Sequence, residues 1–487
     1  GAASADAPDD AARQRLVTEA LIANWGISPP KHPIIVAGST GSRGSTAMLM
    51  RSVANLEQGA LVLPGFDMHL PAAAWAALGN AATGEDHPQY RFAHLLGSLD
   101  VDPPKVSCWD DNDTTPEHRN RLVSLAMRPA PVTDQWMTEG PAFHDVALAA
   151  QGMTLIEAPS PRAEAVAISL VMRKALHDGK TVALVTPDRT LTRQVATALD
   201  RWRIEPDISA GDPLTLSAPG RLFLHVAEQS GRTITAESLL VLLKHPLVNE
   251  ASEHRGQHLL FARRLEAWSR RDGPPFPTGR DICAWSNARG DDTALVGWAN
   301  WIGTIIDLLA DAPHQSVARH LQQHQAIVSA LVSGPHDTPT DGLFDKPAGK
   351  EVARIIDELS RESSRAGELS ALDYCALFRS VLARGEARDP VQPHPDVMIW
   401  GTLEARVQGA DLVILGGLNE GVWPATPAPD PWLSREMRLQ AGLLLPERRI
   451  GLSAHDFQQA IGAGQVVLSR AIRDAESETV VSRWVNR

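Results

Sequence analysis

The sequence predicts an α/β protein with parallel sheets and one large, all-helical insertion. Two short apolar runs, residues 397–400 and 412–415, end at glycines and have the form of strands buried on both faces. Strands alternate with helices over residues 152–202, which is the pattern of a parallel βαβ unit. From residue 233 to residue 389 helical segments follow one another and strand-like runs vanish. A chain of 487 residues is too long for one core, so we expect two to four domains.

A first βαβ unit is expected near the N-terminus. Its elements are a leading helix over residues 13–25, a strand over 33–38, a helix over 46–56 and a strand over 61–63. The glycine-rich loop over residues 38–46 is not a P-loop, because Arg43 stands five residues after Gly38 and the loop holds no lysine. Its backbone N–H groups offer an anion site at a helix N-terminus, although a tight strand-to-helix turn is the commoner explanation.

A second unit follows from residue 152. We expect a strand over residues 153–156, a helix over 162–176, a strand over 182–185 and a helix over 191–202. Glu164 stands in the first turn of the first of these helices. There it is either a site-facing carboxylate or a glutamate stabilised by the helix dipole, and we favour the second interpretation.

The helical region and the stretch after it complete the chain. The main helices are expected over residues 237–243, 258–269, 294–310, 316–332 and 348–360. Between the two glycine-bounded strands, Thr402 is a possible N-cap for one or two helical turns over residues 402–408. Residues 416–424 leave the second strand, and ligands bind at the carboxyl ends of strands in open α/β sheets, so this loop is a candidate site. A final strand is expected over residues 466–468.

Composition sets bounds on location and partners. The net charge of −12 counts against autonomous, tight, non-specific DNA binding, although a local basic groove or a partner subunit remains possible. Three scattered cysteines, Cys108, Cys283 and Cys375, exclude a disulfide framework and fit a reducing cytoplasm. We expect no membrane span, because no run of eighteen apolar residues occurs, and no signal peptide. The abrupt ends suggest a piece of a longer protein.

Four stretches in order resemble one family. The run GTLEAR…ADLVILGGLNEGVWP at residues 401–424 resembles the motif V region of UvrD-type superfamily 1 helicases, and above all the AddB subunits of bacterial AddAB helicase–nucleases. Residues 34–67, 157–202 and 447–471 resemble the regions of motifs III, IV and VI. The resemblance implies RecA-like lobes: the remainder of a first lobe (1–150), a second lobe in two halves (151–232 and 393–487) and a 2B-like helical insertion (233–392).

The sequence departs from active helicases of that class wherever ATP is handled. No glutamine occurs between Gly38 and Thr46 in the motif III region. The motif VI arginine that contacts the γ-phosphate is replaced by residues 456–462, which contain no arginine, and the motif V glutamate is replaced by Val407-Gln408-Gly409. Phosphoryl transfer needs a lysine cradle, a metal-binding acid and a cation at the γ-phosphate. The sequence therefore predicts a segment without ATPase activity.

The resemblance implies a function and partners. We expect a non-motor subunit that guides single-stranded DNA in recombinational double-strand break repair, beside an active AddA-type helicase–nuclease. Two alternatives remain: an ATP-dependent helicase lobe whose ATP motifs lie outside this segment, and a protein-binding scaffold without DNA contact. The family's nuclease domain carries magnesium and an iron–sulfur cluster held by four cysteines, which three scattered cysteines cannot build. No cofactor, catalytic, nucleotide-binding or metal-binding residue is therefore expected in this chain.

The same resemblance places DNA on the strand-end loops. The expected contacts are Thr402, Arg406, Asn419 and Trp423 on the second lobe and Thr40 and Ser42 on the first. Trp423 either stacks on a base, which is worth about 1–3 kcal/mol, or packs against Pro424 and its neighbours.

Overall fold

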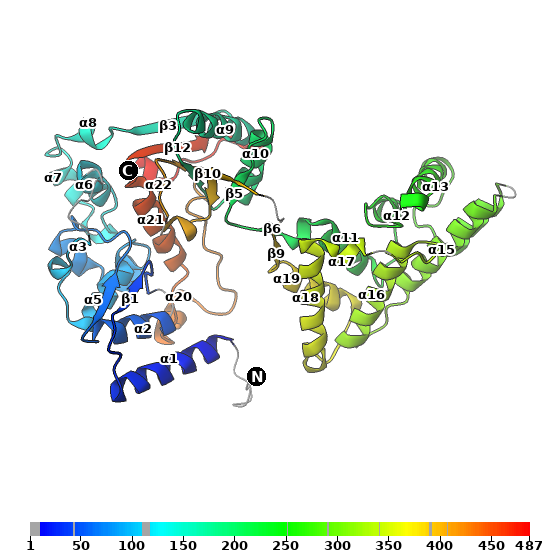
Figure 1. Ribbon diagram of the computed structural model, residues 1–487, viewed down its shortest axis with the longest axis horizontal. Helices are drawn as coiled ribbons and strands as arrows, with labels where there is room; N and C mark the ends of the chain where they lie inside the picture. Colours follow the sequence, from blue (N-terminus) through cyan, green and yellow to red (C-terminus); the bar gives the residue numbers. More distant parts are fainter. Residues whose placement is uncertain are drawn as a thin grey trace. The chain divides into compact units, whose positions relative to one another are not determined.

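The computed structural model describes residues 10–41, 44–109, 117–250, 252–289, 292–339, 341–388, 392–406 and 408–487. The chain divides into two compact units. Gly1–Ser209 and Gln392–Arg487 form the α/β unit, and Ala210–Val391 form the helical unit (Figure 1). Each unit has its own buried core.

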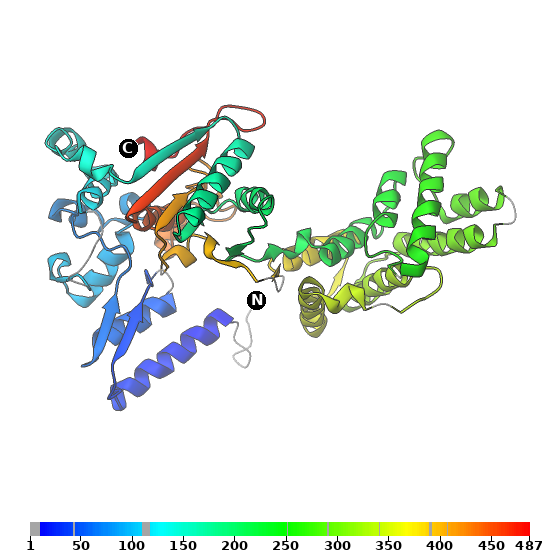
Figure 2. The ribbon, with the colours of Figure 1, turned by 45° about the horizontal axis from the view of Figure 1, so that its top comes forward.

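A six-stranded parallel sheet is the centre of the α/β unit, in the order β3-β12-β11-β4-β10-β5. The strands are β3 (Met153–Ala158), β4 (Val182–Val185), β5 (Pro206–Ile208), β10 (His394–Trp400), β11 (Leu412–Leu415) and β12 (Gln465–Ala471). Figure 2 shows β12 running alongside β3 over its whole length. The α/β class and the parallel sheet are confirmed. The strands β10 and β11, consecutive in the chain, are not neighbours, because β4 lies between them.

Helices cover both faces of this sheet because alternate strand residues point to opposite sides. In β4, Val182 and Leu184 pack with α9 (Pro161–His177) and α10 (Arg189–Asp200). Ala183 and Val185 pack on the other side with α21 (Arg448–Ile461) and α6 (Glu117–Ala126). The result is a three-layer arrangement, which explains why the strands are apolar on both faces.

The first 150 residues carry a smaller βαβ unit, as expected. β1 (Ile34–Ala37) and β2 (Gly59–Val62) pair in parallel, and α2 (Gly44–Ala54) connects them. Ser42 and Arg43 lie outside the described residues. The remaining elements here are α1 (Asp10–Ile27), α3 (Ala72–Ala77), α4 (Ala81–Gly84), α5 (Tyr90–Leu99), η1 (Pro103–Lys105), η2 (Ala130–Val132), α7 (Gln135–Glu139) and α8 (Val146–Ala149).

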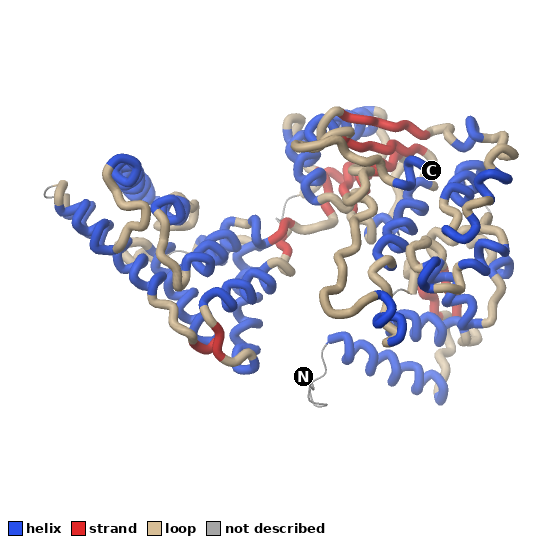
Figure 3. The backbone as a smooth tube through the Cα atoms, turned by 180° about the vertical axis from the view of Figure 1, so that it is seen from behind, coloured by secondary structure: helices blue, strands red, loops and turns tan. Residues whose placement is uncertain are grey.

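The helical unit begins at Ala210, upstream of residue 233, because α11 packs into the helical core through Leu222 and Phe223. Figure 3 shows helix as its dominant structure. Its helices are α11 (Ala218–Gln229), α12 (Ala236–Leu243), α13 (Ser252–Arg271), α14 (Gly279–Asn287), α15 (Thr293–Ala310), α16 (Val317–Ser333), α17 (Gly342–Asp345), α18 (Pro347–Glu362) and α19 (Ala371–Leu382), with 3₁₀ turns η3 (Leu214–Leu216) and η4 (Ser363–Arg365). Two short antiparallel pairs join β6 (Asp212–Pro213) to β9 (Glu386–Ala387) and β7 (Gln315–Ser316) to β8 (Glu368–Leu369).

Helix α15 is, among the described helices, the one long and apolar enough to cross a membrane by length and composition alone. Its Trp298, Ile302 and Ile305 are nevertheless buried in the helical core. The apolar character of α15 is thus used inside the protein, as expected for a core helix.

The chain ends in short elements around the candidate loop. Residues 402–408 were expected to form one or two helical turns. Val407 lies outside the described residues, and the described part of this range contains the 3₁₀ turn η5 (Glu404–Arg406). After β11 come α20 (Arg435–Gln440), α21, β12 and α22 (Arg483–Asn486).

Candidate functional site

Loops at the carboxyl end of the sheet meet around Glu164, in the first turn of α9. Its Oε1 accepts hydrogen bonds from the backbone N–H of Gly417 (2.9 Å) and from the hydroxyl of Ser469 (2.7 Å). The side chain is buried, and this burial raises the pKa of its carboxyl above the ordinary value. Glu164 therefore stands at a helix N-terminus, as expected, and it also ties the loop after β11 to the end of β12.

Asn419 belongs to a second buried network. Its Nδ2 donates to the Ala471 carbonyl (3.0 Å), and its Oδ1 accepts from Nε of Arg470 (3.0 Å). Arg470 also donates to Oε1 of Glu157 (2.6 Å). Asn419 is buried and its amide is engaged at both ends, so in this conformation it fixes the loop and presents little surface to a ligand.

Trp423 is fully buried. Its ring meets that of Phe457 edge to face, with centroids 6.1 Å apart, and its Nε1–H donates to the Ser453 carbonyl (3.3 Å). The peptide bond from Trp423 to Pro424 is cis. Both of its partners lie on α21, so Trp423 joins the candidate loop to the core of the α/β unit.

The other expected contacts differ in exposure. Arg406 forms an ion pair with Asp456 of α21 at 2.5 Å, and both side chains are largely buried. Thr40 is buried in the first 150 residues. Thr402 keeps a partly exposed side chain, and Ser42 lies outside the described residues. Arg406 and Trp423 therefore both contact α21, whereas Thr402 stays accessible. Whether any of them contacts DNA stays a prediction.

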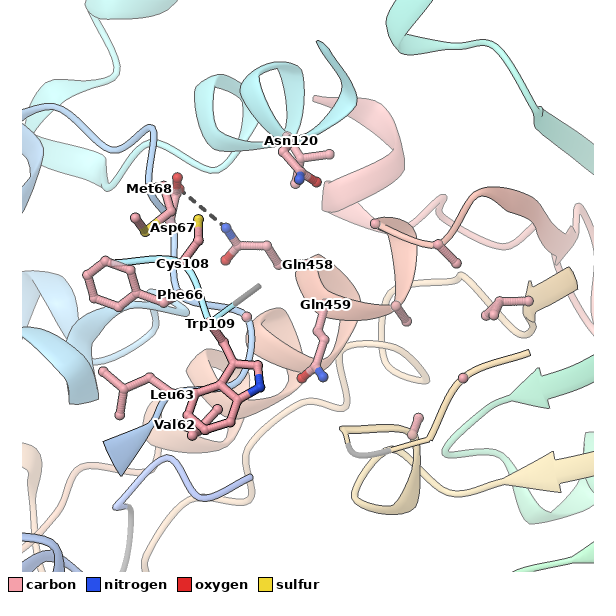
Figure 4. Close-up of a pocket in the computed structure, with 18 of the residues that line it drawn as sticks. Val62, Leu63, Phe66, Asp67, Met68, Cys108, Trp109, Asn120, Gln458 and Gln459 are labelled. Carbon is pink, nitrogen blue, oxygen red and sulfur yellow. Dashed lines mark hydrogen bonds between the residues drawn. The ribbon is translucent and has the colours of Figure 1, made fainter. Parts of the chain in front are cut away.

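A cavity of about 1300 Å³ lies inside the α/β unit, between α21 and the segment after β2 (Figure 4). Neutral amides are prominent in its lining, with Asn120, Gln408, Gln458 and Gln459 among them. Among the described lining residues the charged side chains are Asp67 and Glu117, and no lysine or arginine occurs. The electrostatic character of the cavity is thus neutral to acidic.

Hydrogen bonds hold α21 against the segment after β2. Nε2 of Gln458 donates to Oδ2 of Asp67 (3.3 Å), and Nε2 of Gln89 donates to Oε1 of Gln458 (3.0 Å). Nε2 of His455 bonds to the Pro64 carbonyl (2.7 Å). Burial raises the pKa of the Asp67 carboxyl. The contact between these two parts is built from amides, an imidazole and one carboxylate.

Sequence reasoning missed most of this cavity. The available signal was the absence of arginine over residues 456–462, a range that includes Gln458 and Gln459. Asp67 and Trp109 had none, because they reach the cavity from loops distant in sequence. Trp109 is 73% exposed and lines the same cavity.

The described side chains offer no ready metal centre. No group of three or more His, Cys, Asp or Glu residues close enough to hold an ion occurs in the described ranges. Cys108 is exposed, and Sγ of Cys283 lies 3.3 Å from Oδ1 of Asn300. Cys375 is buried, which raises the pKa of its thiol. These three cysteines lie on separate elements and do not fit a four-cysteine cluster.

Comparison with known proteins gives little guidance. No described protein family matches the chain. A similar curated protein is an uncharacterized protein of Rickettsia felis, 22% identical over 274 residues. The matched region is 56% of this chain and 28% of the relative, so the chain spans less than a third of that relative's length.

Proposed function

We propose that this chain is the helicase-like, non-motor part of an AddB-type subunit. In this proposal it guides single-stranded DNA during recombinational double-strand break repair, in the cytoplasm, beside an AddA-type helicase–nuclease. Two features support the assignment. Three of the four motif-like stretches supply strands and strand-end loops of the six-stranded sheet, and the fourth, residues 34–67, forms the separate pair β1 and β2. The helical unit is inserted between β5 and β10, where the resemblance implies a 2B-like domain.

The lining of the 1300 Å³ cavity is the observation that carries the non-motor part of the proposal. A bound triphosphate concentrates negative charge, and phosphoryl transfer needs cations placed against it. The described lining offers Asp67, Glu117 and neutral amides instead. Gln458 lies in the range 456–462, where the resemblance would put the γ-phosphate arginine, and it is hydrogen-bonded to Asp67 and Gln89. We infer that α21 and the segment after β2 keep a fixed arrangement around this cavity in this subunit.

DNA contact is proposed at the surface of the strand-end loops. Of the expected residues that the structure describes, Thr402 is partly exposed, Arg406 is largely buried in its ion pair with Asp456, and Asn419, Trp423 and Thr40 are buried. In this proposal the DNA strand contacts Thr402 and the exposed surface around it. The buried residues set the shape of the loops, so their effect on DNA binding is indirect.

Fluorescence anisotropy of a labelled single-stranded oligonucleotide at two salt concentrations, together with an ATPase assay, tests the proposal. We expect binding that weakens as salt rises, because released counterions carry the affinity, and no ATP turnover. Thr402→Glu should weaken binding severalfold through repulsion of phosphate, whereas Thr304→Glu, on the exposed side of α15, should not. ATP hydrolysis by the chain favours the active-helicase alternative instead.

A second candidate, a protein-binding scaffold, is favoured by the net charge of −12. An acidic surface repels phosphate unless a partner supplies cations. In that case the oligonucleotide does not bind to the chain alone, even at low salt. DNA binding should then occur only when the chain is in a complex with an AddA-type partner.

A further inference from the structure

A surface hollow of about 210 Å³ lies in the helical unit, between the first turns of α13 and α15. Its lining residues, called the α13–α15 hollow below, are Asn249, His254, Gln257, His258, Phe261, Thr293, Ala294, Gly297, Trp298, Pro335 and His336. The described lining includes no lysine, arginine, aspartate or glutamate. The hollow is therefore unsuited to phosphate. Its three histidines do not form a group close enough to hold a metal ion among the described residues, so the hollow favours a neutral ligand.

The floor of the hollow contains an unexplained polar group. Asn249 is 2% exposed, and its Oδ1 has no hydrogen-bond partner among the described residues. A buried acceptor without a donor is costly and is rare in native structures. The left-handed backbone of Asn249 (φ 46°) favours asparagine or glycine, but it does not explain why the amide is buried unpaired. Gly334 covers this oxygen, since a Cβ added there would stand 2.2 Å from it, so a ligand can donate to the oxygen only once the turn at Gly334 moves aside.

The walls are aromatic and held in place. The rings of His254 and His336 lie 4.3 Å apart and tilted by 39°, at the mouth of the hollow. On the floor, Nε1–H of Trp298 donates to Nδ1 of His258 (3.0 Å), and Nε2 of His258 bonds to the Leu243 carbonyl (2.7 Å). Burial lowers the pKa of His258 to about 4, so this imidazole is neutral and fully engaged. It fixes the indole. Of the outer histidines, His254 has its Nε2 3.5 Å from Oε1 of Glu253, so the ring faces of His254 and His336 are what they offer to a ligand.

Helix α15 lines the hollow with a glycine, so its backbone is exposed there without a side chain. Gly297 lines it, and a Cβ built at Gly297 meets no atom within 4 Å. A flat group can therefore lie directly against the helix. The volume exceeds that of the cavity of about 150 Å³ that accepts benzene in an engineered protein, so a bicyclic ring can enter.

We propose that the α13–α15 hollow binds an unpaired nucleobase. Protein sites for unstacked bases combine aromatic faces, including histidine, with side-chain amides that bond the base edge. Here His254 and His336 supply the faces, and the amides of Asn249 and Gln257 supply a donor and an acceptor each. The base comes either from a free nucleoside or from a single strand. The inference does not rest on the proposed function, since a free nucleoside tests it without DNA guidance.

The test is calorimetric titration of the whole chain with adenosine, and anisotropy with a labelled single-stranded oligonucleotide. Gly297→Leu fills the hollow from an open position, and Asn249→Gly removes the amide while keeping the left-handed backbone. Gly256→Leu is the matched control, because a Cβ there also meets nothing within 4 Å and Gly256 does not line the hollow. Circular dichroism melting checks that each variant folds.

We expect Gly297→Leu and Asn249→Gly to weaken adenosine binding about tenfold or more, with Gly256→Leu unchanged. If adenosine does not bind but the oligonucleotide does, the same pattern on the oligonucleotide assigns the base to a strand. The proposal is overturned if neither probe binds, if Gly297→Leu leaves both affinities unchanged, or if Gly256→Leu loses as much.

Discussion

At the residue scale, the candidate loop is built from side chains that serve packing. Trp423 could be expected either to stack on a base or to pack, and its burial follows from contacts with α21, thirty or more residues later in the chain. No local pattern carries that information, because an indole after a strand looks the same in both cases. The absence of arginine over residues 456–462, in contrast, could be read directly from the sequence.

Trp423→Ala should destabilise the fold by about 3–5 kcal/mol, because it empties a fully buried site and removes the bond to Ser453. Trp432→Ala is the matched control, since that indole is 86% exposed and its loss should change stability by less than about 0.5 kcal/mol. Urea unfolding followed by circular dichroism measures both. Similar losses in the two variants would contradict the packing described for Trp423.

Glu164→Gln tests the buried carboxylate. Because the folded pKa of Glu164 is raised, its protonated form is favoured in the fold. The resulting stability is fully present below the unfolded pKa of about 4.3 and is lost as pH rises through the folded pKa. Wild type should therefore lose stability relative to Glu164→Gln between pH 4, below the unfolded pKa, and pH 7, above it. Urea unfolding at both values measures the gap, and a constant gap would argue against the raised pKa.

At the element scale, the apolar strands of the six-stranded sheet were the easiest features to predict. The runs of β3, β4, β10, β11 and β12 stand out by apolar content and flanking glycines. β5 was missed, because three residues that begin with proline give almost no pattern. The order of the strands could not be predicted either, since several buried strands of similar composition pair equally well with one another.

Helix α14 offers an element-scale test. Thr278 and Asp281 form a capping box, in which each side chain bonds the other residue's backbone N–H. Thr278→Ala should cost about 0.5–2 kcal/mol of the free energy of unfolding. Thr304→Ala, inside α15, should be neutral or slightly stabilising, because its hydroxyl only bonds the Asn300 carbonyl within the helix. Thermal melts of both variants compare a helix end with a helix interior, and equal costs would rule out the capping role.

At the scale of the whole molecule, the two units have separate cores. Their existence could be predicted from the change in character along the chain. The boundary at Ala210 could not, because the apolar stripe of α11 has the same spacing whether it packs on a sheet or on other helices. Separate cores permit separate unfolding.

Scanning calorimetry should therefore resolve two transitions. Leu184→Ala, in the centre of the sheet, should lower the midpoint of one of them, and Trp298→Ala, in the helical core, should lower the other. A single transition that both substitutions shift equally would mean that the units unfold together.

The strand order also has a consequence in time. The early strands β3, β4 and β5 have no early neighbour in the sheet, because each pairs only with β10, β11 or β12. Between β5 and β10 the ribosome must make roughly 180 residues, which takes about 10–40 s at ordinary rates of synthesis. During that interval β3, β4 and β5 have no partner strand while the helical unit is synthesised. The nascent chain is thus most prone to aggregation, and most in need of a chaperone, just before residues 394–471, which supply β10, β11 and β12, appear.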